Sequence, residues 1–132
     1  MGSTDRKNKG QSLVEFTLVV PILLLLLVGA AEFGRLWMTQ NILVGAAREA
    51  VRILAVDPLL GGGPGPANIR ADNVLLSANI TGYTVQLVDD GVPFGTVTAT
   101  VSYTVPLAVA GFVPGLDADI PLVSSTSMRK EF

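Results

Sequence analysis

The sequence contains neither cysteine nor histidine. The absence of cysteine excludes a disulfide framework and thiolate chemistry. The absence of histidine removes the commonest general base and the commonest metal ligand of proteins. Among the residues that remain, no nucleophile, base and orienting group can be named together. We therefore expect a protein that is not an enzyme and that has no metal site and no cofactor.

Charge is scarce as well. In 132 residues, 9 basic side chains stand against 11 acidic ones, which leaves a net charge of −2. This charge provides no basic field for a phosphate backbone, so we expect no nucleic-acid partner. The acidic pairs Asp89-Asp90 and Asp117-Ala118-Asp119 lack the spacing of a calcium-binding loop and have the composition of turns.

One long uncharged stretch dominates the beginning of the chain. Residues 16–31 contain no charged side chain, and as a helix they extend over about 24 Å. Leu13 and Val14 lengthen the stretch, with Glu15 drawn toward the lipid headgroups, so that it approaches the ~30 Å hydrocarbon core of a bilayer. The pattern predicts a single membrane-spanning helix.

The charges that flank this stretch predict its orientation. Residues 1–9 are polar and carry three basic side chains against one acidic one. By the positive-inside rule this end stays in the cytoplasm, and the residues after Ala31 are delivered outside. A secretory signal peptide is the alternative, because the small residues 29–31 resemble a cleavage site. Glu15 within the apolar core, and a helical pattern that continues past Ala31, argue against it.

The residues at the start of the apolar helix carry a resemblance. Gly10 is followed by Gln11-Ser12-Leu13-Val14-Glu15-Phe16, and basic residues lie just upstream, which resembles the processing site of a type IV prepilin. Together with Glu32-Phe33-Gly34-Arg35 and Ala46-Ala47-Arg48-Glu49-Ala50, the pattern resembles more narrowly the TadE-like pilins or pseudopilins of tight-adherence (Tad) systems. Met128-Arg129-Lys130-Glu131 is similar to the end of these proteins.

The resemblance implies a processing site and a filament. A prepilin peptidase would cut after Gly10, so that residues 1–10 are a leader and the mature chain begins at Gln11. The carboxylate of Glu15, the fifth mature residue, would neutralise the new α-amino group of a neighbouring subunit and set the filament register. The alternative is a Glu15 hydrated at the cytoplasmic headgroups.

The resemblance also implies the partners. These are other pilin subunits in a homo- or hetero-polymer, the prepilin peptidase, the inner-membrane assembly machinery, and membrane lipid before assembly. The implied function is that of a subunit assembled into or beneath a tight-adherence pilus for surface attachment. The implied final location is the pilus at the cell surface.

Four residues of the apolar helix are expected to pack against other subunits. Pro21 removes one backbone hydrogen bond, which membrane helices tolerate where neighbours satisfy the freed carbonyl. Gly29 and Gly34 permit close approach of another helix. Phe16 is the fourth residue that we expect to contact other subunits.

The helical period continues beyond the apolar stretch and predicts one long helix over 11–57, membrane-spanning first and then amphipathic. Asp57-Pro58 ends the pattern, and residues 58–66 predict a glycine- and proline-rich linker. The expected buried side of the second part includes Phe33, Leu36, Trp37, Gln40, Leu43, Val44, Ala47, Val51 and Leu54. For Trp37 an interfacial anchor at the outer membrane surface is the favoured interpretation.

Residues 67–132 predict an extracytoplasmic pilin-like domain. Residues 67–80 read as a short helix, with Ile69, Val74, Leu75 and Ala78 near one face. After Gly82 the period changes to two, which predicts strands over 83–88, 96–105 and 120–128. Between them we expect a turn at 89–95 and a long apolar loop at 106–121, in which Phe112, Val113 and Leu116 are candidates for partner contact. The fold class is therefore α+β, with a small antiparallel sheet of about three strands.

Two further functions stay open at this point. One is a major filament-forming pilin, and the other is a membrane-anchored extracellular binding domain that never polymerises. Gly10 together with Glu15 favours the pilin interpretations, because a plain anchor has no use for an acid at that position.

Overall fold

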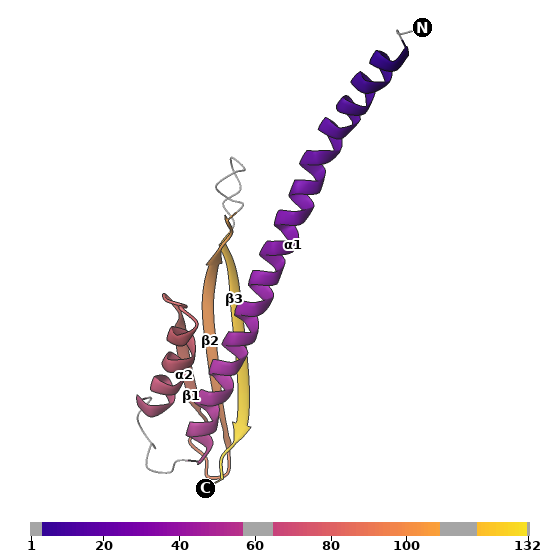
Figure 1. The fold of residues 1–132 in the computed structure, drawn as a ribbon. Coiled ribbons are helices and arrows are strands. Elements are labelled where there is room, and N and C mark those ends of the chain that lie inside the picture. The colour runs from indigo at the N-terminus through magenta and orange to yellow at the C-terminus, as the bar shows by residue number, and fades with distance from the viewer. Residues whose placement is uncertain (1–3, 57–64, 109–118, 132) are drawn as a thin grey trace. The chain divides into compact units, whose positions relative to one another are not determined.

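The described residues form two helices and one antiparallel sheet (Figure 1). The computed structural model describes residues 4–56, 65–108 and 119–131. The helices are α1 (Thr4–Val56) and α2 (Gly65–Ser77), and the strands are β1 (Thr84–Asp89), β2 (Thr96–Pro106) and β3 (Asp119–Arg129). The chain divides into two units, Met1–Arg35 and Leu36–Phe132. The predicted fold class is confirmed.

Helix α1 supplies all the helical structure of the first unit and the first element of the second. It continues through Pro21 and ends at Val56, directly before the predicted stop. Its N-terminal end lies at Thr4, so residues on both sides of Gly10 are helical. Asp57-Pro58 and the predicted linker residues up to 64 lie outside the described residues.

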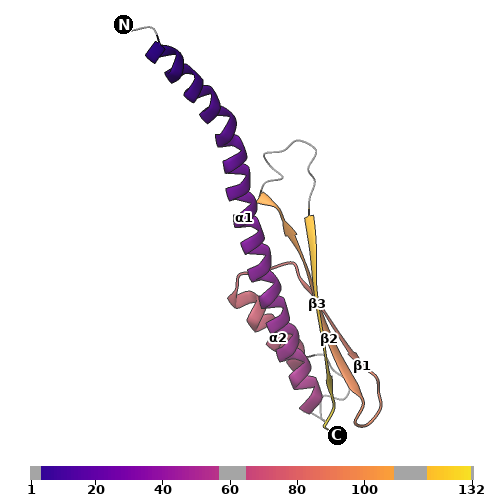
Figure 2. The same ribbon diagram turned by 90° about the vertical axis from the view of Figure 1, so that its right-hand side faces the viewer.

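The three strands form a sheet in the order β1-β2-β3 (Figure 2). Both pairings are antiparallel, with Val85 opposite Val101 in one and Val101 opposite Ser124 in the other. The alternation predicted for β2 is confirmed, because Val97, Ala99, Val101 and Val105 are buried. On the other face the hydroxyls of Thr98 and Ser127 (2.9 Å), and of Thr100 and Ser125 (3.0 Å), hydrogen-bond across the strands.

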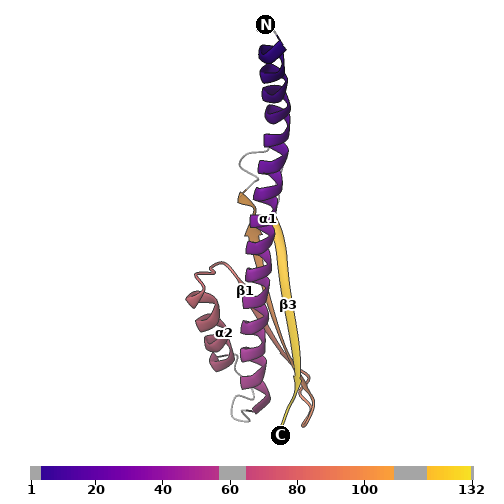
Figure 3. The ribbon, with the colours of Figure 1, turned by 45° about the vertical axis from the view of Figure 1, so that its right-hand side comes forward.

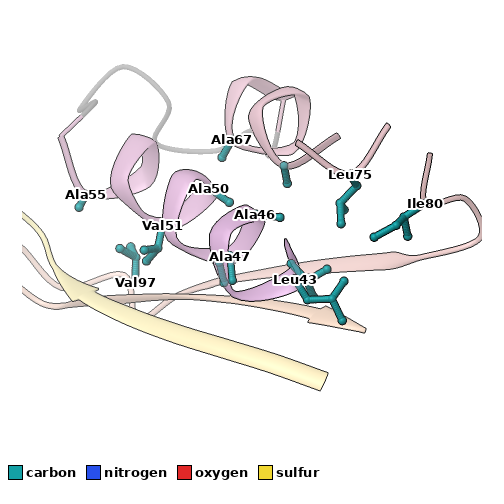
Figure 4. Close-up of a cluster of buried hydrophobic side chains, with 13 residues drawn as sticks. Leu43, Ala46, Ala47, Ala50, Val51, Ala55, Ala67, Leu75, Ile80 and Val97 are labelled. Atoms are coloured by element: carbon teal, nitrogen blue, oxygen red, sulfur yellow. The ribbon is translucent and has the colours of Figure 1, made fainter. Parts of the chain in front are cut away.

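Both helices of the second unit pack on one face of this sheet (Figures 3 and 4). The shared core is built around Leu43 and Val51 of α1, Leu75 of α2, and Val97 and Val101 of β2. Alanines occupy many of the other core positions of the two helices; they are Ala46, Ala47, Ala50, Ala55, Ala67 and Ala71, all without exposed surface. Because alanine side chains are small, the helix backbones can approach each other closely and the larger side chains interdigitate at few points.

The buried side of α1 differs from the predicted one at its beginning. Phe33 and Trp37 are 66% and 64% exposed, and the fully buried positions start at Leu43. The prediction weighted large apolar residues and omitted Ala46 and Ala50, although these alanines mark the side that faces the core. The exposure of Trp37 accords with the interpretation in which this residue does not belong to the core.

Two element boundaries also need correction, the beginning of α2 and the beginning of β3. Helix α2 begins at Gly65 with Pro66 in its first turn, so the last two residues of the predicted linker are helical; proline suits this position because its missing N–H has no helical acceptor there. Within α2, Leu75 is fully buried, whereas Ile69, which was predicted near the same face, is 58% exposed. Strand β3 begins at Asp119 and contains Pro121, which shortens the predicted loop. Phe112, Val113 and Leu116 lie outside the described residues.

The end of the chain is fastened to the other elements by what we call the C-terminal clamp, formed by Lys130, Asp89 and Asp90. The Lys130 ammonium lies 2.6 Å from Asp89 Oδ1 and 3.3 Å from Asp90 Oδ1, and its side chain is only 5% exposed. The next residue, Glu131, donates its backbone N–H to the carbonyl of Ala55 near the end of α1 (3.0 Å). The clamp therefore joins β1, the turn that follows it, and the segment after β3.

The clamp predicts a pH dependence of stability. Hydrogen bonds from Lys130 and the Gly91 N–H lower the pKa of Asp89, and backbone N–H donors of Thr96 and Val92 lower the pKa of Asp90. Carboxyls whose pKa is lowered on folding contribute stability above their unfolded value of about 4 and lose it as the pH falls through the folded value. The hydrogen bond to Asp89 raises the pKa of Lys130, so its contribution is present below the unfolded lysine value of about 10 and is lost at higher pH.

We therefore expect the urea midpoint of the full chain in detergent to fall from about pH 5 downward. Lys130→Met should lower the urea midpoint at neutral pH. It should also make the fall of the midpoint below about pH 5 less steep, because the ammonium that stabilises the two ionised carboxylates is gone. Arg52→Met, at an exposed position of α1, is the control and should leave the pH dependence of the urea midpoint unchanged. If the midpoint of Lys130→Met falls as steeply in acid as that of the unchanged chain, the ion-pair account is contradicted.

Candidate functional site

The apolar segment of α1, residues 13–31, exposes large apolar side chains that no other described element of the fold covers. Twelve large apolar side chains from Leu13 to Val28 are between 44% and 70% exposed. The helix that contains them is long and apolar enough to cross a membrane, and its most apolar window is entirely unburied. An exposed apolar surface of this extent indicates contact with lipid or with other protein chains.

Glu15 is the charged residue at the N-terminal end of this segment. The Gln11 side-chain amide donates a hydrogen bond to Glu15 Oε1 (3.3 Å), one helical turn away. The two residues that the sequence assigns to processing and to register are thus brought together by the helix. Both side chains are exposed, so the Glu15 carboxylate can accept further donors from outside the chain.

Pro21 leaves one backbone group of the helix without its usual donor. Proline has no N–H to offer the carbonyl of Thr17, four residues before it. The Thr17 hydroxyl donates to the Leu13 carbonyl (2.7 Å), which ties this turn to the preceding one while the helix continues. The Thr17 carbonyl, which lacks this donor, is thus a polar group within an apolar surface, and a donor on a neighbouring chain is one way to satisfy it.

Gly29 and Gly34 are not required by any contact within the chain. A Cβ atom built at either position meets no described atom within 4 Å. Glycine within a helix is destabilising by roughly 0.5–1 kcal/mol relative to alanine, so these positions carry a cost that the described fold does not offset. Small residues on an exposed helix surface allow another helix to come close.

These residues lie along one helix and do not converge on a pocket. Gly10 and Gln11 lie just before the apolar segment, Glu15, Phe16, Pro21 and Gly29 lie within it, and Gly34 lies just after it. The arrangement provides a hydrophobic surface, one carboxylate, and two glycines at which another helix can come close. Its chemistry is that of association rather than of bond making.

Sequence reasoning missed two features of the second unit. The first is the C-terminal clamp, because nothing in the sequence pairs Lys130 with carboxyls 40 and 41 positions earlier. The second is the hydrogen bond from the Tyr83 hydroxyl to Asp72 Oδ1 (2.6 Å), which raises the pKa of Tyr83 to about 12 and joins α2 to the residue before β1. For the clamp, the only available signal was the acidic pair itself, which the sequence assigned to a turn.

The fold and the exposed helix define a class of protein in which, among the residues that the structure describes, one candidate membrane helix precedes an α+β unit. Residues 10–52 match the family model described as TadE-like protein. The match spans 43 of the 132 residues and confirms the predicted resemblance: over this segment the chain is TadE-like. No curated protein and no solved structure gives a significant match to the chain.

The matched segment contains every residue that the sequence assigned to processing, register and packing. The match supports a pilin-like protein associated with Tad pili. It implies association with other components of such a pilus. The candidate membrane helix is consistent with a membrane-anchored component.

Proposed function

We propose that the chain is a pilin-like subunit of a Tad pilus that is cut after Gly10 by a prepilin peptidase and assembled into or beneath the filament for surface attachment. The observation that carries this proposal is the exposed apolar segment of α1, which begins within six residues after Gly10 and lies inside the TadE-like match. Before assembly the segment lies in the membrane, with the N-terminal end in the cytoplasm and the α+β unit outside.

The apolar segment makes extraction from the membrane possible in energetic terms. In the bilayer its side chains contact lipid tails, which are as apolar as leucine. In a filament the same side chains contact helices of other subunits, so little hydrophobic burial is lost and close packing is gained at Gly29 and Gly34. The donor-less carbonyl of Thr17 can find a partner in the same step.

Glu15 provides the register in this proposal. Cleavage creates a positively charged α-amino group on Gln11, and a carboxylate that meets it away from water attracts it strongly. Either charge alone in that place is costly, so a subunit that is shifted along the filament axis is penalised. In an isolated chain the Gln11 side-chain amide occupies one Glu15 oxygen, a weaker interaction that the α-amino group of a neighbour replaces.

A major, filament-forming pilin is a second candidate of the same kind. A membrane-anchored binding domain that never polymerises is a third candidate. The open space beside Gly29 and Gly34 argues against it, because glycine destabilises a helix and a helix that contacts only lipid gains no packing in return.

The N-terminal residue of the protein from native cells tests the proposal. We expect the intact mass to correspond to a chain that begins at Gln11, and we expect Gly10→Val to remain uncut, because a β-branched side chain replaces the small residue at the cut. Gly34→Ala, elsewhere on the same helix, is the control and should be cut normally. A native chain that begins at Met1 would support the plain anchor, and one that begins at Glu32 would mean a secreted domain.

A further inference from the structure

Helix α2 ends in a turn that is formed by backbone groups. The Asn79 N–H donates to the Leu76 carbonyl (2.9 Å), and the Ile80 N–H donates to the Leu75 carbonyl (2.9 Å). These two hydrogen bonds define a Schellman motif, in which Asn79 takes the left-handed conformation with a φ of 57°. The helix is therefore ended without a contribution from the Asn79 side chain.

Ile80 anchors this turn to the rest of the α+β unit. Its side chain is 6% exposed and belongs to the same core as Leu75 (Figure 4). An apolar residue at this position commonly accompanies a Schellman motif. The residues on either side of Ile80, which are Asn79 and Thr81, are both exposed.

The described fold uses neither of these two exposed side chains. Within residues 4–56, 65–108 and 119–131, no hydrogen bond is formed to the Asn79 amide or to the Thr81 hydroxyl. Glycine takes a positive φ at less cost than asparagine, so the turn does not require an amide at position 79. Thr81 follows the motif and takes no part in its two hydrogen bonds. Both polar groups are therefore available to a partner outside the chain.

Asn79-Ile80-Thr81 has the Asn-x-Thr pattern of an acceptor for an N-linked glycan. The chain contains asparagine at positions 8, 41, 68, 73 and 79, and the asparagine at 79 alone is followed by serine or threonine two residues later. Residues 78–83 are neither helix nor strand, which agrees with the surface loop that this pattern requires. An exposed amide, an exposed hydroxyl and irregular backbone thus coincide at the one place where the pattern occurs.

We propose that Asn79 is the acceptor of an N-linked glycan and that a glycosyl diphosphate is the donor. The Asn79 amide nitrogen forms a bond to the anomeric carbon of the sugar. The bond from that carbon to the diphosphate oxygen breaks, the diphosphate leaves with the electron pair, and one amide proton passes to a base of the transferase. The Thr81 hydroxyl is the group by which the transferase recognises the acceptor.

The inference rests on the proposed function, because that function places the α+β unit outside the membrane. A donor whose diphosphate is linked to a lipid is accessible there and transfers a preassembled oligosaccharide. A donor whose diphosphate belongs to a nucleotide transfers a single sugar. A glycan at this position is bulky and hydrated, so the turn at the end of α2 faces solvent in the assembled pilus.

Mass spectrometry of the full chain from native cells tests the site. We expect an intact mass above that of the polypeptide, and fragmentation that leaves the glycan attached should locate the added mass on residue 79. An added mass of several sugars identifies the lipid-linked donor, whereas that of one sugar identifies the nucleotide-linked donor. Either added mass supports the acceptor.

Substitutions within the pattern separate recognition from folding. Asn79→Gly should lose the added mass completely and keep the near-ultraviolet circular dichroism of the folded unit, because glycine suits the left-handed conformation. Thr81→Val should also lose the added mass, whereas Thr81→Ser retains a hydroxyl and should keep it. Asn73→Gln is the matched control, since Asn73 is exposed on the same helix but is followed by Leu75, and it should leave the added mass unchanged.

Three results would overturn the site: a native chain with the mass of the bare polypeptide, an added mass on a residue other than Asn79, or an added mass that survives Thr81→Val. The same spectra report the first residue of the chain. A chain that begins at Gln11 without a glycan overturns this site and leaves the proposed function standing. A glycosylated chain that still begins at Met1 supports the site and fails the proposed function.

Discussion

Leu75→Ala is expected to lower the free energy of unfolding of the α+β unit by about 2–5 kcal/mol, the range for a fully buried leucine. The Leu75 side chain has no exposed surface and lies in the core that α1, α2 and the sheet share. Around it the helices contribute mostly alanines, which cannot extend into the space that a missing leucine leaves. Since whole domains are stable by about 5–15 kcal/mol, this single change removes a large fraction of the total.

The neighbouring leucine provides the control for this prediction. Leu76 is 56% exposed on the same helix, and Leu76→Ala should change stability by less than about 0.5 kcal/mol. Urea unfolding of the full chain in detergent, followed by near-ultraviolet circular dichroism, measures both variants. Equal losses for the two leucines would show that α2 does not pack with the side described here.

The second large effect is expected at Glu15. Glu15→Gln keeps the size and one acceptor of the side chain but removes the charge, and in the proposed filament it leaves the α-amino group of a neighbouring Gln11 without a counter-charge. Removing one partner of a buried ion pair costs about 3–5 kcal/mol, so incorporation into filaments should fall by about a hundredfold or more. Quantitative immunoblotting of sheared filaments against the membrane fraction measures this ratio.

Glu32→Gln is the matched control on the same helix. Glu32 pairs with Arg35 three residues later (2.9 Å), a contact within one turn of α1 that does not depend on another subunit. Such local pairs are worth about 0–1 kcal/mol, so incorporation should change by only a few fold. If Glu15→Gln is incorporated as well as Glu32→Gln, the charge at position 15 does not set the register.

The elements with a strong local period could be predicted from the sequence. Strand β2 alternates valine and alanine with threonine and serine, and the structure buries the first set. The end of α1 at Val56 follows from the proline two residues later. The apolar segment could be recognised because a run of leucines without charge has few other interpretations.

The features that depend on distant residues could not be predicted. The clamp joins positions 89, 90 and 130, and their proximity follows from the antiparallel registers of β1 with β2 and of β2 with β3 rather than from any local pattern. The buried side of α1 was misjudged near Phe33 because hydrophobicity alone does not tell a side chain that faces the core from one that faces the outside. The turn at 89–95 was predicted, but the positive φ of Phe94 within it (56°) was not, because a sequence does not display the sign of φ.

The position of β3 has a consequence for biogenesis. Strand β3 and Lys130, which fastens the sheet, follow the other described helices and strands in chain order, and β3 pairs with β2 along its whole length. Until these residues have been synthesised, β2 keeps an open edge and the Ala55 carbonyl lacks its partner, the Glu131 N–H. A chain cut before Asp119 is therefore left with an incomplete sheet, which makes it a substrate for proteolysis.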